Sequence, residues 1–144
     1  NRAVIEDIIL MVQEEVARRV VATEKSSAKQ YGLLTILSQF WAECSIIRVV
    51  GRRSFYPAPK VNSALISLKV RKEPLLQLSD YTFFRRVIKS AFAQRRKTLK
   101  NCLLGGGFER EKIVSAIEKM GLDENIRGEK LSIEKFGELS ELLK

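Results

Sequence analysis

The segment Ile5-Glu6-Asp7-Ile8-Ile9-Leu10-Met11-Val12 decides how the first half of the chain is expected to fold. Its last five residues form the longest apolar run in the sequence, and that length suits a β-strand rather than a membrane span of about 18–20 residues. A continuous apolar run is typical of a strand that is covered on both faces. We therefore expect parallel strands on both sides of residues 5–12 and helices on both faces of the sheet.

The residues that follow supply too few elements to complete such a sheet. Helical spacing predicts helices over residues 13–22 and about 33–44. The second helix carries an apolar stripe formed by Leu34, Leu37, Phe40 and Trp41. Only two further strands are predicted, over residues 45–50 and 64–70, and the alternation in the latter leaves one face open to solvent. We expect the C-terminal portion of a longer protein, with a small complete domain around a three-stranded sheet as the alternative.

The character of the chain changes at Glu73-Pro74. Strand and helix patterns alternate before this point, whereas only helical patterns follow it. The sequence therefore predicts an α/β part over residues 1–73 and a small all-helical part over residues 74–144. The expected fold class is α/β plus α.

Helix-start signals divide the second part into three predicted helices. A cap at Ser79 or Asp80 begins a helix that runs to about residue 104 and ends at three glycines. A shorter helix is predicted over about 109–120. The last helix begins after Ser132, where Leu131 and Phe136 have the spacing of a hydrophobic staple.

Positive charge is concentrated in the middle of the chain. The sequence holds 26 Lys and Arg against 17 Asp and Glu, which gives a net charge of +9 with no histidine. Residues 51–104 hold thirteen basic and two acidic side chains, whereas residues 1–50 are neutral overall and residues 105–144 carry a net −2. A polyanion is the partner that such an excess predicts.

Composition also argues against several function classes. The absence of histidine removes the commonest general base and metal ligand, so a zinc hydrolase, a Ser-His-Asp enzyme and a metal site are not expected. Cys44 and Cys102 are too few and too far apart for a disulfide framework, so we expect reduced thiols in a cytoplasmic protein. The first residues are acidic rather than basic, so no signal peptide is predicted. We expect a soluble monomer with no membrane partner.

Residues 82–104 contain no acidic side chain, and on one continuous helix six of their cations share a face about 120° wide. The six are Arg85, Arg86, Lys89, Arg96, Lys97 and Lys100. A solvated helix normally mixes charges of both signs, so a phosphate-binding face is favoured over a merely soluble one. Arg95 falls within the apolar stripe instead. Three explanations stay open: it pairs with an acid from elsewhere, the helix ends or bends near it, or it lines a cleft.

A loop of sequence GRRSFYPAPK, residues 51–60, is the second informative feature. Its two prolines lack a backbone donor, which predicts a rigid extended loop rather than the interior of a strand. Adjacent aromatic rings at Phe55 and Tyr56, preceded by two arginines, could form a platform on which a nucleobase stacks. The alternative is a strand connector whose rings pack inward, and composition does not separate the two.

Five segments of the chain, in this order, resemble the ribosomal RNA small-subunit adenine dimethyltransferase family. They are LMVQEEVARR (10–19), YGLLT (31–35), FYPAPKVNSA (55–64), AFAQRRKTL (91–99) and RGEKLS (127–132). The ordered set extends over most of the chain and is far more specific than the proline-containing loop alone. Asn62 stands where many members have Asp, which is a mild departure.

The resemblance implies the end of a Rossmann-like methyltransferase domain, closed by an antiparallel hairpin strand and followed by a small helical domain that binds rRNA and the small ribosomal subunit. Members of the family transfer methyl groups from S-adenosylmethionine to two adjacent adenines of small-subunit rRNA during ribosome biogenesis. That chemistry needs an unstacked adenine held by an aromatic ring, a role that the resemblance assigns to Phe55. The residues expected to contact RNA are Arg52, Arg53, Pro57, Lys60, Arg85, Lys89, Arg95, Arg96, Lys97 and Lys100.

The resemblance also implies what this chain does not contribute. The family's Gly-rich cofactor loop, its acidic ribose-binding residue and its Asn-Leu-Pro-Tyr catalytic motif correspond to positions upstream of Asn1. The G-x-G pattern here lies within Gly105-Gly106-Gly107, after a predicted helix rather than between a strand and a helix. We expect S-adenosylmethionine to bind the complete enzyme and not this chain alone. A non-enzymatic module, whose C-terminal helices bind duplex DNA as a helix-turn-helix does, is the alternative function.

Overall fold

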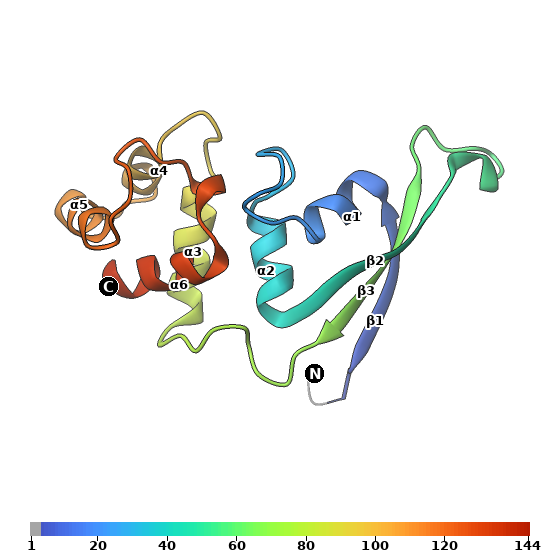
Figure 1. The fold of residues 1–144 in the computed structure, drawn as a ribbon, viewed down its shortest axis with the longest axis horizontal. Helices are drawn as coiled ribbons and strands as arrows, with labels where there is room; N and C mark the ends of the chain where they lie inside the picture. The colour runs from blue at the N-terminus through green and yellow to red at the C-terminus, as the bar shows by residue number, and fades with distance from the viewer. Residues whose placement is uncertain (1–3) are drawn as a thin grey trace. The chain divides into compact units, whose positions relative to one another are not determined.

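The computed structural model describes residues 4–144. The chain divides into two compact units, Asn1–Leu75 and Leu76–Lys144, each with a core of its own. The first unit contains a sheet and two α-helices, and the second contains four α-helices (Figure 1).

The sheet of the first unit has three antiparallel strands in the order β1-β3-β2. They are β1 (Asp7–Gln13), β2 (Ala42–Val50) and β3 (Ser63–Val70). Ile66 of the central strand pairs with Leu10 on one side and Ile46 on the other. The β2 register shifts between Ile46 and Arg48, a bulge that increases the local twist of the hairpin.

The prediction of parallel, doubly covered surroundings for the first strand was wrong for the described residues. β1 runs antiparallel to β3, and within residues 4–144 it pairs with no other strand. Its residues Ile9 and Met11 point away from the helix-covered face and are 63% and 52% exposed. An apolar run indicates that both faces suit burial, but it contains no information about the direction of the neighbouring strands.

One face of the sheet is covered by α1 (Glu14–Val20), next to α2 (Leu33–Trp41). The core between α1 and the sheet is formed by Ala17, Val20, Ala64 and Ile66. The stripe predicted for α2 is partly wrong: Phe40 is buried, but Leu34 is 45% exposed and Ile36 is buried in its place. The helix also ends at Trp41 rather than near residue 44, because Ala42 has extended backbone and pairs with Val70.

The helices of the second unit are α3 (Tyr81–Ala91), α4 (Leu99–Gly105), α5 (Arg110–Lys119) and α6 (Ile133–Leu142). Their shared core is formed by side chains less than 2% exposed, among them Phe84, Leu99, Leu103, Ile113, Phe136 and Leu139. Two predicted caps are confirmed: Asp80 accepts a hydrogen bond from the Phe83 N–H at 2.9 Å, and Ser132 accepts one from the Lys135 N–H at 3.3 Å.

The long helix predicted up to residue 104 is wrong, because the chain forms two helices there. α3 ends at Ala91, and α4 begins after Thr98, whose hydroxyl caps the Asn101 N–H at 3.3 Å. A backbone hydrogen bond from Leu99 N–H to the Ile126 carbonyl, 2.8 Å long, fixes the start of α4 from a distant part of the sequence. Arg95 lies in the turn between the helices, which confirms the second of its three explanations, a helix that ends near it.

A short 3-10 turn, Gly128–Lys130, packs closely against the end of α3. A Cβ atom on Gly128 would lie 3.0 Å from the carbonyl oxygen of Ala91 and 3.4 Å from the Ala91 Cβ. Gly128 is buried, and its missing side chain is what allows the two backbones to approach.

Glu141, near the end of α6, joins this helix to the start of α3. Its carboxylate accepts hydrogen bonds from the N–H of Ser79 at 3.2 Å and from the Ser79 hydroxyl at 2.6 Å. These hydrogen bonds hold the pKa of Glu141 below its ordinary value. The pairing stabilises the charged form of the carboxylate and so makes this contact sensitive to acid.

Candidate nucleic-acid interface

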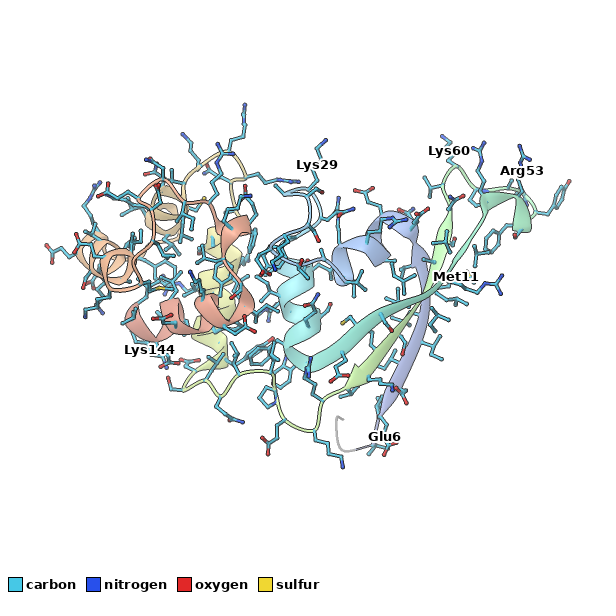
Figure 2. All side chains as sticks on the ribbon, viewed as in Figure 1. Glu6, Met11, Lys29, Arg53, Lys60 and Lys144 are labelled. Atoms are coloured by element: carbon cyan, nitrogen blue, oxygen red, sulfur yellow. The ribbon has the colours of Figure 1, made fainter. Side chains whose placement is uncertain are left out.

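The loop that joins β2 to β3, residues 51–62, is the first part of the candidate interface. It lies at the end of the hairpin (Figure 1), and Arg53 and Lys60 are at that end (Figure 2). The loop begins with a 3-10 turn, Arg52–Ser54, and the peptide bond between Tyr56 and Pro57 is cis. Residues 51–61 contain three cationic side chains and no acidic one, so the loop presents positive charge to solvent.

Asn62 holds the base of this loop against α1 through both ends of its side-chain amide. Its Oδ1 accepts a hydrogen bond from the Arg52 N–H at 3.1 Å, and its Nδ2 donates to Glu14 Oε2 at 3.1 Å. The Glu14 N–H donates in turn to the Asn62 carbonyl at 3.0 Å. Arg52 and Asn62, near the start and at the end of the loop, are therefore tied to each other, and Asn62 is tied to the start of a helix.

The neighbours of Glu14 favour its charged, carboxylate form. Arg18 donates to Glu14 Oε1 from Nε at 3.0 Å and from Nη2 at 2.5 Å. The hydrogen bond from Arg18, followed by the one from Asn62, lowers the pKa of Glu14 below its ordinary value. The side-chain amide of Asn62 supplies a donor toward Glu14, which an ionised carboxylate at this position would not.

The two aromatic side chains of the loop differ in exposure. Tyr56 is fully exposed, whereas Phe55 is half-buried. Arg52, Arg53 and the other cation of the loop, Lys60, are exposed, as is Pro57. Neither sequence interpretation describes the loop fully, because one ring faces solvent and the other is partly covered.

The cations of the helical unit form a second basic group, but not the single helical face that was predicted. Arg85, Arg86 and Lys89 lie on α3 and are exposed. Arg95, Arg96 and Lys97 lie in the turn of residues 92–98 and are exposed as well. The prediction was wrong because it continued one helix through this turn, and the angular positions calculated for a continuous helix do not apply.

Lys100 is separated from the other cations by its surroundings. It lies on α4 and borders a small hollow together with Glu118 and Glu124. Two carboxylates therefore lie near this lysine, whereas no acidic residue borders the hollow that Arg86 and Lys89 share. Among the cations named from the sequence, Lys100 has the surroundings least suited to a phosphate.

Sequence reasoning missed the residues that anchor the loop. Asn62 and Glu14 are 48 positions apart, and only the pairing of β1 with β3 brings them together. No local pattern signals such a contact. Sequence reasoning also placed Arg86 on the cationic face without including it among the binding residues, although it borders the same hollow as Lys89.

Other kinds of site are not found in the described part of the chain. Residues 4–144 contain no group of three or more His, Cys, Asp or Glu side chains that could hold a metal ion. No helix in that range is long and apolar enough to cross a membrane.

Known proteins with a similar sequence are named as enzymes of ribosomal RNA. The family model "Ribosomal RNA adenine dimethylase" matches residues 1–144. The "Ribosomal RNA small subunit methyltransferase A" of Moorella thermoacetica is 41% identical over 143 residues, covering 99% of this chain and 49% of that protein. The protein of the same name from Bacillus licheniformis is 44% identical over 141 residues, covering 95% of this chain and 48% of that protein.

Two solved structures show a similar fold. A dimethyladenosine transferase from Plasmodium falciparum superposes with a TM-score of 0.75 at 23% identity, covering 96% of this chain and 57% of that one. The 23S rRNA methyltransferase ErmE superposes with a TM-score of 0.63 at 26% identity, covering 96% and 55%. The chain thus spans about half the length of the relatives it matches.

Proposed function

Because the chain belongs to the ribosomal RNA adenine dimethylase family, we propose that it is part of an enzyme that transfers methyl groups from S-adenosylmethionine to two adjacent adenines of small-subunit rRNA. The observation that carries this proposal is the loop of residues 51–62, which combines two aromatic rings and three cations and is fastened at its base by Asn62. A methyltransferase that acts on a base must hold that base outside the stack. A rigidly attached aromatic loop suits this task.

The first unit, in this proposal, is the end of a Rossmann-like methyltransferase domain. β1 pairs with one strand within residues 4–144, and Ile9 and Met11 are largely exposed. Apolar side chains on a strand are normally covered by further structure. The relatives are about twice as long as this chain, so the remaining half of such a protein is the source we propose for additional strands and covering helices.

Within residues 4–144, the glycine-rich run does not fit the cofactor. A nucleoside cofactor in a Rossmann-like domain binds at a glycine-rich turn that leads from a strand into a helix. The run Gly105-Gly106-Gly107 instead ends α4 in the helical unit. We propose that the cofactor is bound by the other half of the complete enzyme.

We propose separate tasks for the two basic groups. Phe55 packs against the target adenine and limits its orientation, while Arg52, Arg53, Pro57 and Lys60 contact the adjacent RNA. The helical unit contacts rRNA phosphates through Arg85, Lys89, Arg95, Arg96 and Lys97, and Lys100 contributes less because Glu118 and Glu124 lie near it. Phosphate contacts of this kind give affinity and position, not base specificity.

The first test is binding of the 144-residue chain to a structured fragment of small-subunit rRNA, compared with a DNA duplex of equal length. We expect tighter binding to the rRNA fragment and a steep loss of affinity as salt increases. Equal affinity for both nucleic acids would contradict the proposal and favour a general nucleic-acid-binding module. The measurement is fluorescence anisotropy at several salt concentrations.

The second test separates catalysis from docking in a protein that carries this chain together with the upstream half found in its relatives. We expect Phe55→Ala to lower the methylation rate and leave affinity for the small subunit nearly unchanged. The double change Arg96→Glu and Lys97→Glu should weaken binding first. Tyr56→Ala is the matched control for the ring. If Tyr56→Ala slows methylation and Phe55→Ala does not, the assignment of the stacking ring to Phe55 is wrong.

A further inference from the structure

A hollow of about 310 Å³ lies between the last turns of α3 and the end of α4. Its lining includes Arg86, Lys89 and Ser90 from α3, Gln94 from the following turn, and Cys102 and Gly106 from the other wall. The volume is roughly ten times the share of one water molecule in the liquid, which is large enough for a phosphate group and part of its sugar. The turn that closes one side joins α3 to α4 (Figure 1).

The charge on this lining is entirely positive. Arg86 and Lys89 are its charged residues, and no acidic side chain borders the hollow. Ser90 and Gln94 add a hydroxyl and an amide, both of which can donate hydrogen bonds to an anion. The adjacent turn contributes Arg95, Arg96 and Lys97, all exposed, so the surroundings increase the positive potential at the opening.

Arg86 is held in place before any ligand binds. Its Nη2 donates to the carbonyl oxygens of Gly106 at 3.1 Å and Gly107 at 3.5 Å. The guanidinium carbon lies 4.7 Å from the centre of the Phe108 ring. A guanidinium has five N–H donors in a rigid plane, and these contacts use one of its nitrogens. An arginine fixed in this way loses little conformational entropy when it binds a phosphate.

The glycine at residue 106 brings the two walls together. A Cβ atom there would lie 2.3 Å from the Ser90 hydroxyl oxygen, a separation that real structures do not permit. The Cys102 thiol donates to the Gln94 carbonyl at 3.3 Å and ties the turn to α4. The shape of the hollow thus depends on the absence of a side chain at Gly106 and on the hydrogen bond between Cys102 and Gln94.

We propose that this hollow is a binding site for one backbone phosphate of folded RNA, held by Arg86, Lys89 and the Ser90 hydroxyl. The proposal rests on the RNA-binding function proposed above and identifies which part of the helical unit grips the RNA backbone. It also separates Arg86 and Lys89, which share the site, from Lys100, which lies beside carboxylates.

The test is a salt titration of rRNA binding by the full chain and by Lys89→Gln. Each phosphate contact releases about 0.7–0.9 of a counterion, so the loss of one contact should make the negative slope of log K against log salt less steep by that amount. At 0.1 M salt the same loss corresponds to about five- to eightfold weaker binding. Lys119→Gln, which removes an equal charge from α5 outside the hollow, should leave the slope unchanged.

Two further measurements address the nature of the site. Arg86→Lys keeps the charge but loses the planar donor fork, so we expect weaker binding with a nearly unchanged slope. Titration of inorganic phosphate and of AMP, followed by the backbone amide signal of Gly106, shows whether free anions occupy the hollow. Saturable binding of either anion, combined with unaltered RNA binding by Lys89→Gln, would overturn the assignment to RNA.

The possible failures can be told apart. If the wild-type chain binds the rRNA fragment and Lys89→Gln and Arg86→Lys bind it equally well with the same slope, the phosphate site is wrong and the proposed function stands. If the wild-type chain does not bind the rRNA fragment at all, both are wrong. If Lys119→Gln makes the salt slope less steep by as much as Lys89→Gln does, the effect depends on net charge alone. That result would also overturn the proposed phosphate site.

Discussion

Replacing Gly128 with alanine tests whether the close approach of two backbones organises the helical unit. The added Cβ would lie 3.0 Å from the Ala91 carbonyl oxygen, whereas ordinary contacts begin near 3.4 Å. The neighbour is backbone at the end of α3, and Ala91 is itself only 4% exposed, so it cannot rotate away. One of the two backbones must therefore shift by a few tenths of an ångström.

Overpacking of this kind destabilises a core by about 1–3 kcal/mol. For a unit of this size, each kcal/mol lowers the midpoint of thermal unfolding by about 4–8 °C, so we expect a decrease of roughly 5–20 °C. The assay is thermal unfolding of the full chain followed by far-UV circular dichroism, since the helical unit supplies most of the helical signal. Denaturant unfolding provides the free energy directly.

Two other glycines serve as controls of graded severity. A Cβ on Gly105 meets nothing within 4 Å, so Gly105→Ala should leave stability unchanged or raise it by up to about 1 kcal/mol. A Cβ on Gly137 would lie closest to the end of the Leu76 side chain, at 2.8 Å, and that side chain can rotate. The reasoning is refuted if Gly128→Ala unfolds at the wild-type temperature, or if Gly137→Ala costs more stability than Gly128→Ala.

Three further predictions concern the loop, the acid limit and a thiol. In a protein that carries this chain with the remaining half of its relatives, Asn62→Ala should slow methylation, because it removes the amide contacts that hold the loop to Arg52 and Glu14; an unchanged rate would contradict the anchoring role. The contacts of the Glu141 carboxylate with Ser79 stabilise the fold at pH values above the ordinary carboxyl pKa of about 4.3, and this stabilisation is lost as the pH falls through the lowered pKa of Glu141. Glu141→Gln should therefore make the midpoint of unfolding depend less on pH in the acid range. An unchanged acid profile would count against this role of Glu141. Burial raises the pKa of the Cys44 thiol, so in a Cys102→Ser background it should alkylate more slowly than free cysteine at about pH 8.5; equal rates would show that the thiol is accessible and unshifted.

Local signals in the sequence predicted several elements well. The hydroxyl cap at Ser132 and the pair Leu131 and Phe136 fixed the start of the last helix, and both staple residues are fully buried. Strands were expected near residues 45–50 and 64–70, where β2 and β3 form the hairpin. These successes share a cause, because caps, staples and alternation act between residues close in sequence.

The errors arose where distant residues decide the structure. Residues 92–98 include good helix formers, yet the helix stops because Leu99 bonds to Ile126 and the Cys102 thiol bonds to Gln94. The direction of β1 depends on pairing with β3, some fifty positions away. Arg95 on the apolar stripe was a real sign that one continuous helix did not fit, although it did not show where the helix ended.

The candidate site was predicted only in part, because some of its contacts join residues far apart in the sequence. Aromatic and basic residues in the loop are visible in composition, so the loop itself was identified from the sequence. The contacts that hold it, from Asn62 to Arg52 and Glu14, exist only once the sheet has formed. The hollow between α3 and α4 was not predicted, because it depends on the turn that the sequence did not reveal.

The unpaired edge of β1 has a consequence for how the 144-residue chain behaves on its own. One edge of β1 has no partner strand within residues 4–144, and its run Ile8-Ile9-Leu10-Met11-Val12 contains neither charge nor proline. Native proteins protect such edges, because unpaired N–H and C=O groups on an apolar strand serve as a template for other extended chains. We expect the separate 144-residue chain to self-associate as its concentration rises. We expect Ile9→Lys to delay that association. An apolar strand edge of this kind is a site of aggregation unless further structure covers it.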